Sequence, residues 1–267
     1  MPQPLKTFNV LSLGAGVQSS VLAYMYELGE LSPLPDFAVF ADTQREPKAV
    51  YDHLHSIKKK ITRFPIYTAT KGDLGEYPNK IPFFLKREGQ KRGMGWRQCT
   101  SEFKIAVVHK EIRRVIGLAP RKRWNAHINM ILGITTDEEG RRRLAPEKWK
   151  TNTYPFLNKL KMSRGDCLGY LIINELPMPP KSSCYFCPYK SDRQWVEMRE
   201  SEPEDFKRAV EYDYWMRKHG RNHKGERTEN VYIHTSCTPL DKVVFKSKVR
   251  RISESLEDAC DGLMCGI

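Results

Sequence analysis

The first half of the chain alternates between short apolar segments and segments with helical periodicity, and this alternation constrains the fold most strongly. The apolar segments predict buried strands, and the periodic segments predict helices. The predicted strands are residues 9–13, 37–41, 65–70 and 128–134, and the predicted helices are residues 17–30, 48–60 and 101–116. Strands that alternate with helices form a parallel sheet covered on both faces. We therefore expect an α/β protein with a doubly wound parallel sheet.

Beyond Glu139 the alternation weakens and loops become more frequent. The segment "SSCYFCPYKS" reads as a loop, and residues 192–218 are mostly helical in pattern. We predict an α/β domain over residues 1–153 and a helical, cysteine-containing region over residues 154–267. The alternative is one domain that includes both.

Basic residues are in excess and clustered. The chain carries 45 Lys and Arg against 32 Asp and Glu, a formal net charge of +13. Basic runs are usually solvated faces, but this number of runs, with Trp96 and Trp124 among them, favours a polyanionic partner. We expect a nucleic acid, RNA or DNA. The runs lie at residues 57–60, 86–97, 121–124, 141–143, 217–227 and 246–251.

The cysteines favour metal binding or thiol chemistry over disulfides, because the chain has seven of them and no secretion signal. No apolar run is long enough to span a bilayer, so we expect a cytoplasmic protein with no membrane partner. Cys167 and Cys237 are assigned to packing. His109, His127 and His234 lack the spacing of metal ligands.

A glycine-rich stretch, "SLGAGVQSS" at residues 12–20, joins the first predicted strand to the first predicted helix. Backbone N–H groups of such a turn, together with the positive end of a helix, can hold an anion without the lysine of a Walker loop. The alternative is a strand-to-helix turn with a hydroxyl cap. Two more polar segments, "ADTQREP" at 41–47 and "GITTDEEGR" at 133–141, also follow predicted strands. Carboxyl ends of parallel strands share one edge of a sheet, where ligands bind.

These motifs, in this order, resemble the PP-loop superfamily of nucleotide-binding enzymes, in particular its phosphoadenylylsulfate (PAPS) reductase-like family. The glycine-rich loop is similar to the family's "SGGxDS" loop, residues 42–51 to its "DTGxxxPxTY" segment, and residues 133–141 to its "GIRxDESxxR" segment. "CTSEFKIAVV" at 99–108 is similar to a further family segment. The resemblance spans residues 9–187. Gln18 stands where many members carry Asp, and Thr135 replaces an Arg that members use near the anionic substrate.

The resemblance implies a Rossmann-like PP-loop fold and an adenine nucleotide ligand, either ATP or a PAPS-type nucleotide. It implies that Asp42 contacts the ribose, the base or a Mg²⁺ ion; the alternative for Asp42 and Thr43 is a helix cap near Pro47. The nucleotide-binding residues implied are Ser12, Gly14, Ala15, Gly16, Gln18, Ser19, Ser20, Asp42, Thr43, Lys104, Gly133, Asp137 and Arg141.

Cys184 and Cys187 form a C-x-x-C pair, whose spacing suits one metal ion or a redox dithiol. With Cys99 they make three thiolate ligands. Some PP-loop RNA thiolation enzymes hold a [4Fe-4S] cluster on three cysteines, whereas iron-containing sulfonucleotide reductases use four. We favour a [4Fe-4S] cluster over zinc.

The tail "ACDGLMCGI" contains Cys260 and Cys265. Sulfonucleotide reductases end in an "ECGLH"-like tail whose cysteine attacks the sulfate sulfur, and residues 265–267 are similar to its "CG" portion. We predict that these thiols act as nucleophile or persulfide carrier. The alternatives are a fourth metal ligand or an inert terminus.

Three functions follow from these features. The first is an ATP-dependent enzyme that performs sulfur transfer or adenylation on a nucleic acid and accounts for the charge, the loop and the cysteines together. The second is a sulfonucleotide reductase that releases sulfite with a thioredoxin-like partner. The third is a non-catalytic, nucleic-acid-associated protein of the same fold. We favour the first, with a sulfur-donor protein as a further partner.

Overall fold

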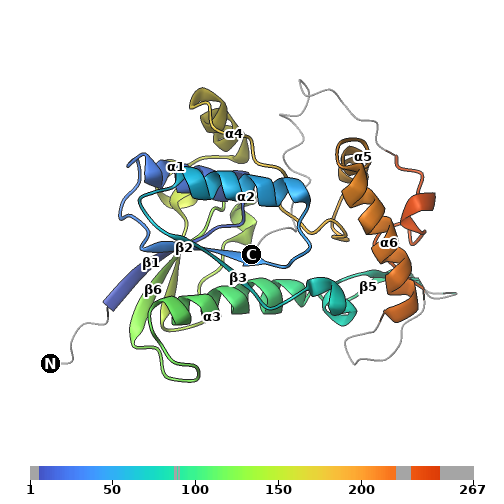
Figure 1. Ribbon diagram of the computed structural model, residues 1–267, viewed down its shortest axis with the longest axis horizontal. Helices are drawn as coiled ribbons and strands as arrows, with labels where there is room; N and C mark the ends of the chain where they lie inside the picture. The colour runs from blue at the N-terminus through green and yellow to red at the C-terminus, as the bar shows by residue number, and fades with distance from the viewer. Residues whose placement is uncertain (1–5, 87–88, 90, 221–229, 247–267) are drawn as a thin grey trace. The chain divides into compact units, whose positions relative to one another are not determined.

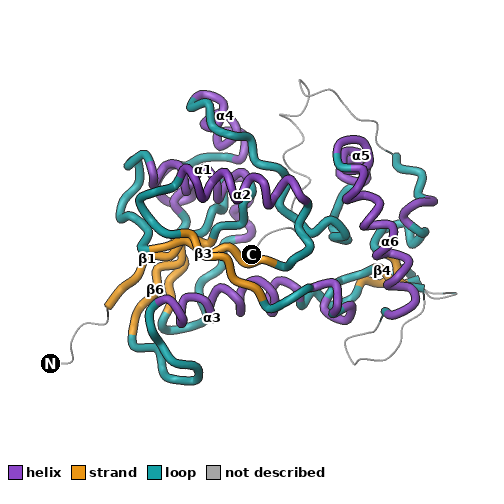
Figure 2. Tube along the Cα trace, viewed as in Figure 1, coloured by secondary structure: helices purple, strands orange, loops and turns teal. Residues whose placement is uncertain are grey.

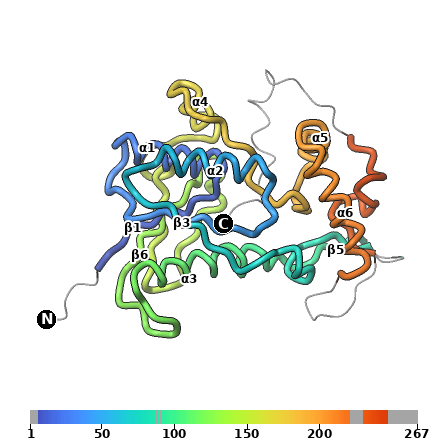
Figure 3. The backbone as a smooth tube through the Cα atoms, viewed as in Figure 1, coloured from blue at the N-terminus to red at the C-terminus, as the bar shows by residue number. Residues whose placement is uncertain are grey.

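The computed structural model describes residues 6–86, 89, 91–220 and 230–246 (Figure 1). The chain forms two compact units, each built from separate segments, as the mixed colours of the backbone in Figure 3 illustrate. Of the described residues, unit 1 takes those in 1–41, 49–69 and 106–182, and unit 2 takes those in 42–48, 70–105 and 183–267. The predicted division after residue 153 rests on sequence pattern alone and stays a prediction.

Unit 1 contains the predicted parallel sheet, so the α/β class is confirmed. Its five strands lie in the order β3-β2-β1-β6-β7. Val10 of β1 pairs with Phe37 of β2 on one side and with Met130 of β6 on the other. The central strand thus has parallel neighbours on both sides. The strands are β1 (Lys6–Ser12), β2 (Phe37–Asp42), β3 (Ile66–Thr70), β6 (Ala126–Ile131) and β7 (Lys150–Thr153).

Helices cover both faces of this sheet (Figure 2). Successive residues of a strand point to opposite faces. In β1, Val10 joins the apolar cluster of α3, while Leu11 joins the cluster of α1, α2 and α4. Among the described residues, no helix has both the length and the apolar character to cross a bilayer. The helices of unit 1 are α1 (Val17–Glu27), α2 (Lys48–Lys60), α3 (Ala106–Val115) and α4 (Arg164–Ile173).

Several boundaries differ from the predictions for local reasons. The first helix ends at Glu27 instead of residue 30, because Gly29 has a φ of 79°, a left-handed conformation that stops a helix. The predicted helix over 101–116 begins as a π-helix at Ser101–Ile105 and continues as α3. The strand β7 was not predicted, because its sequence KTNT lacks apolar residues. It lies at the edge of the sheet, where polar strands are tolerated.

Unit 2 combines a small antiparallel sheet with helices. The sheet has the order β5-β4-β8, and its core includes Phe103, Phe186 and Trp195. Phe186 stacks on Tyr212 with ring centroids 4.0 Å apart. The elements are β4 (Phe84–Leu85), β5 (Gly93–Met94), β8 (Val231–Tyr232), α5 (Asp192–Ser201) and α6 (Pro203–His219), with short 3₁₀ helices at Leu74–Glu76, Pro78–Lys80 and Leu240–Lys242.

A partly buried histidine of unit 1, His109, predicts acid sensitivity. His109 Nε2 lies 3.1 Å from Lys150 Nζ, and its ring packs edge-on against Trp149. Burial and, after it, the Lys150 charge lower the pKa of His109 to about 4, and the Glu147 charge opposes this shift. Between pH 6.5 and about 4 the unfolded chain therefore binds a proton that the folded chain refuses, so stability falls as the pH falls. We expect His109→Gln to flatten this part of the stability curve. The control His55→Gln, at an exposed position, should leave it unchanged.

Candidate functional site

The glycine-rich loop lies between the end of β1 and the start of α1 in unit 1. Ala15 adopts a left-handed conformation, with φ of 55°, and Gly16 is the N-cap of α1. Ser19 closes the loop: its Oγ accepts a hydrogen bond from Gly14 N at 3.1 Å and donates one to Gly16 O at 3.2 Å. Because glycine has no side chain to cap the helix, the amide groups of the first turn suit an anion.

Gly133 brings the neighbouring strand's loop against the glycine-rich loop. It follows β6, which pairs with β1. A Cβ at this position would lie 3.1 Å from the backbone of both Gln18 and Ser19, which is closer than ordinary contacts allow. A side chain at residue 133 would therefore require the two loops to move apart by a few tenths of an ångström.

Gln18 lies in a polar network beside this loop. Its Nε2 donates to Glu138 Oε2 at 3.1 Å, and its Oε1 accepts from Arg164 at 3.1 Å. Arg141 pairs with Glu138 at 2.7 Å, and Asp137 accepts a hydrogen bond from Arg164 N at 2.9 Å. The prediction that residues 12–20 and 133–141 meet is therefore confirmed within unit 1. Arg141 and Arg164 place positive charge in the polar network beside the loop.

Arg164 was missed by sequence reasoning. It is the first residue of α4, which begins with a capping box formed by Ser163 and Asp166. This box marks a helix start in the sequence. It gives no sign that the side chain reaches Gln18, which is 146 residues away in the chain.

The side chains of Ser20 and Thr135 are buried in the interior of unit 1. The Ser20 hydroxyl lies 3.0 Å from His53 Nε2, which links α1 to α2, so Ser20 has a packing role in this structure. Thr135 is fully buried, and its Oγ1 has no hydrogen-bond partner among the described residues. The position where the family carries an arginine therefore holds a small hydroxyl group here.

The remaining predicted nucleotide-binding residues, Asp42, Thr43 and Lys104, belong to unit 2. Asp42 is the last residue of β2, and its Oδ1 accepts a hydrogen bond from Gln44 N at 2.7 Å. This contact caps the turn that follows the strand. The contact is similar to the predicted helix cap, but the capped amide, Gln44 N, belongs to the turn between β2 and α2 and not to α2 itself.

Thr43 is oriented toward Cys184. The two side chains lie 3.3 Å apart, and Thr43 also donates a 3.5 Å hydrogen bond to Glu46 Oε1. Lys104 Nζ lies 3.8 Å from the same Glu46 oxygen. Burial and, after it, the Glu46 charge raise the pKa of the Cys184 thiol to about 12, and the Lys104 charge opposes this shift. Glu46 thus connects three residues that the sequence predicted separately, and it was itself not predicted.

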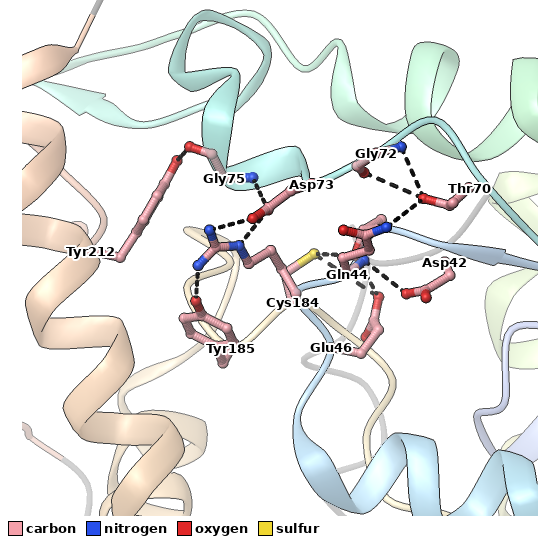
Figure 4. Close-up of polar contacts among 12 residues, drawn as sticks. Asp42, Gln44, Glu46, Thr70, Gly72, Asp73, Gly75, Cys184, Tyr185 and Tyr212 are labelled. Atoms are coloured by element: carbon pink, nitrogen blue, oxygen red, sulfur yellow. Dashed lines mark hydrogen bonds and ion pairs between the residues drawn. The ribbon is translucent and has the colours of Figure 1, made fainter.

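Arg45 fixes the turn that carries these residues. Its guanidinium pairs with both oxygens of Asp73, at 2.5 and 2.6 Å, and hydrogen-bonds the Tyr185 hydroxyl. Tyr185 N donates to Arg45 O at 2.9 Å, so the backbone of the C-x-x-C loop is attached to the residue before Glu46. Tyr212 holds the far side of this network through Gly75 O (Figure 4).

The three predicted metal ligands share the apolar cluster of unit 2. Cys184 belongs to its buried core, and Cys99 and Cys187 pack against it. Cys99 also contributes to the raised pKa of Cys184, so these two thiols are close. Within the described residues, no three His, Cys, Asp or Glu side chains already surround one ion position. Thiolates in apolar surroundings have the donor chemistry of a zinc or iron–sulfur site, and the metal assignment stays a prediction.

The other cysteines divide into two groups. Cys167 is fully buried in the core of unit 1 and Cys237 is buried in unit 2, as expected of packing residues. Cys260 and Cys265, the predicted catalytic thiols, lie outside the described residues. No family model matches the chain, and no curated protein matches it.

Proposed function

We propose that this protein is a PP-loop enzyme of the PAPS reductase-like kind, which binds ATP and uses it for adenylation or sulfur transfer on a nucleic acid. The observation that carries the proposal is the loop of residues 12–20. It follows the central strand of a parallel sheet, leads into a helix with a glycine cap, and lies against Gly133 with Arg141 and Arg164 nearby. Such a loop is suited to phosphate groups.

The chemistry would use the loop as an electrostatic cradle. An oxygen of the acceptor attacks the α-phosphorus of ATP, the acceptor becomes an adenylate, and pyrophosphate leaves. Sulfide then displaces AMP. Where the donor is a protein persulfide, its outer sulfur displaces AMP and a second thiol cleaves the resulting disulfide, so that the carrier thiol and the second thiol end as a disulfide. The α1 amides, together with Arg141 and Arg164, would stabilise the negative charge that develops on the phosphate oxygens.

The cysteines would serve the sulfur step. Cys99, Cys184 and Cys187 would hold the metal centre, and a bound iron–sulfur cluster with an open iron would supply a site for sulfur. Zinc would instead make the site structural. Cys260 and Cys265 would carry sulfur in the tail.

The nucleic-acid acceptor is supported by the charge and by one exposed aromatic residue. Residues 121–123 are all basic and exposed, and Trp96 is 66% exposed beside Arg97. Trp124 differs from Trp96: it stacks on Trp149 at 3.7 Å, with the Arg113 guanidinium over its ring. Trp96 is thus the tryptophan suited to stack on a base, and Trp124 packs within unit 1.

Two other functions remain distinct proposals. A sulfonucleotide reductase would account for Gln18 and for the tail thiols. A non-catalytic protein would bind nucleic acid and turn over no nucleotide.

Product analysis separates the three. The full chain is incubated with ATP and RNA or DNA, and separately with PAPS and reduced thioredoxin. We expect AMP and pyrophosphate to form from ATP only when nucleic acid is present. Sulfite from PAPS would replace our proposal with the reductase, and binding of nucleic acid without any product would replace it with the accessory protein.

A further inference from the structure

Glu46 is a buried carboxylate without adequate partners. Its side chain is 1% exposed, and its Oε2 has no hydrogen-bond partner among the described residues. All of its neighbours are on Oε1 and are distant: Thr43 Oγ1 at 3.5 Å, Lys104 Nζ at 3.8 Å and Cys184 Sγ at 3.9 Å. The Lys104 distance exceeds that of an ordinary N–H···O hydrogen bond, and the Cys184 contact is a long hydrogen bond donated by the thiol. A buried carboxylate left in this state is costly unless a ligand compensates it.

The thiol of Cys184, beside Glu46, indicates which kind of ligand would compensate the carboxylate. Cys184 is a soft sulfur donor, and Cys99 and Cys187 pack against the same apolar cluster. On one tetrahedral zinc ion, bonds of about 2.0 Å to oxygen and 2.3 Å to sulfur place the two ligand atoms roughly 3.5 Å apart. The Oε1–Sγ distance of 3.9 Å in Glu46 and Cys184 is close to this value.

The backbone holds these two ligands in place before any metal arrives. Tyr185 N, next to Cys184, donates to the carbonyl oxygen of Arg45, next to Glu46. The two loops are therefore fixed to each other at the residues that flank the pair. Cys187 N donates to Cys184 O at 2.9 Å, which makes the C-x-x-C segment a tight turn.

The positive charge of Lys104 would offset part of the negative charge of the metal centre. Three thiolates and one carboxylate around Zn²⁺ would sum to a charge of −2, because four negative ligands exceed the ion's two positive charges. An ammonium group in contact range of the carboxylate offsets part of this excess in a low-dielectric surrounding.

From these contacts we propose that Glu46 is the fourth protein ligand of a thiophilic metal centre, completing the set of Cys99, Cys184 and Cys187. The centre is either one zinc ion or an iron–sulfur cluster; on a cluster, the carboxylate would occupy the fourth iron until the sulfur to be transferred replaces it. The inference rests on the metal part of the proposed function and is independent of nucleotide binding. The pair of Glu46 and Cys184 is its preformed half, and Cys99 and Cys187 close around the metal when it binds.

The test compares Glu46→Gln with the matched control Glu102→Gln. Glu102 is also a glutamate of unit 2 paired with lysines, Lys71 and Lys80, but it lies nearer the surface. Each protein is purified without oxygen and without nucleotide. Zinc, iron and acid-labile sulfide are measured, and zinc affinity is determined by competition with a chelator. Circular dichroism confirms that each variant is folded.

We expect Glu46→Gln to weaken metal binding at least tenfold, Cys184→Ala to abolish it, and Glu102→Gln to match the unchanged protein. Iron with sulfide would identify a cluster, and zinc alone a mononuclear site. Wild-type affinity in Glu46→Gln, or no bound metal in the unchanged protein, would overturn the proposal. If the glutamine variant does not fold, Glu46→Cys provides a second test. With Co²⁺ bound, its four thiolates should give a charge-transfer absorbance about one third greater than that of the three thiolates in the unchanged protein. No gain would also overturn the proposal. Nucleotide binding, measured on the same samples, reports separately on the loop.

Discussion

We expect Gly16→Asp to abolish nucleotide binding while the protein stays folded. Gly16 has an extended conformation, with φ of −96° and ψ of 178°, which any residue can adopt. A Cβ there would meet Ser182 Cβ at 3.7 Å, an ordinary contact. Aspartate is a good N-cap, so its carboxylate would accept hydrogen bonds from the α1 amides and occupy the place proposed for phosphate. Competition and charge repulsion then act together.

Gly16→Asn is the matched control, because asparagine caps a helix equally well and carries no charge. We expect the aspartate variant to lose at least 100-fold in affinity for ATP, about 2.7 kcal/mol, and the asparagine variant to lose markedly less. Isothermal titration calorimetry measures the affinities, and thermal unfolding checks that both variants are as stable as the unchanged protein. Equal losses of ATP affinity in the two variants would mean that the size of the side chain at residue 16, and not its charge, excludes the nucleotide. Unchanged binding in the aspartate variant would place the nucleotide elsewhere.

The second large effect is expected at Asp213, which supports the fold of unit 2. Its side chain is fully buried in α6 and accepts hydrogen bonds from Ile233 N at 3.0 Å, Leu240 N at 2.9 Å and Arg217 at 2.6 Å. In Asp213→Asn, an amide group must face at least one of these donors, and the Arg217 charge loses its partner. Breaking a buried ion pair from one side costs about 3–5 kcal/mol.

Asp241→Asn is the control for this substitution. Asp241 is exposed and accepts a hydrogen bond from the Tyr214 hydroxyl, so its loss should change stability by less than about 0.5 kcal/mol. Urea unfolding followed by fluorescence reports on both units, because Trp195 is buried in the core of unit 2 and Trp124 and Trp149 stack in unit 1. If both substitutions cost the same, Asp213 does not hold residues 231–240 against α6.

The sheet could be predicted from sequence because β1, β2 and β6 contain short apolar runs separated by segments with helical periodicity. The position of residues 12–20 and 133–141 after predicted strands also placed both segments at one edge of the sheet, and the structure adds that their strands, β1 and β6, are neighbours. Two things escaped. The strand β7 is polar, so its assignment depends on pairing with β6. The division into two units depends on contacts made by residues 42–48, which continue directly from a strand of unit 1 but belong to unit 2.

The site was predicted in its residue types but not in its connections. Gln18 was recognised as a departure from the family pattern, yet its partners Glu138 and Arg164 are fixed by tertiary structure. Glu46 was read as part of the segment before Pro47, because nothing local shows that Cys184, 138 residues away, lies beside it. Burial and long-range contact decide the role of such residues, and a single sequence does not report either.

The central claim is that residues 12–20 hold the phosphates of an adenine nucleotide. Hydrogen exchange of the full chain, followed by mass spectrometry with and without ATP, tests it most directly. We expect ATP to slow exchange at the amides of residues 14–19 and in the facing segment 133–141, with the effect absent in Gly16→Asp. Binding of ATP that leaves exchange in both segments unchanged, or no binding at all, would contradict the account.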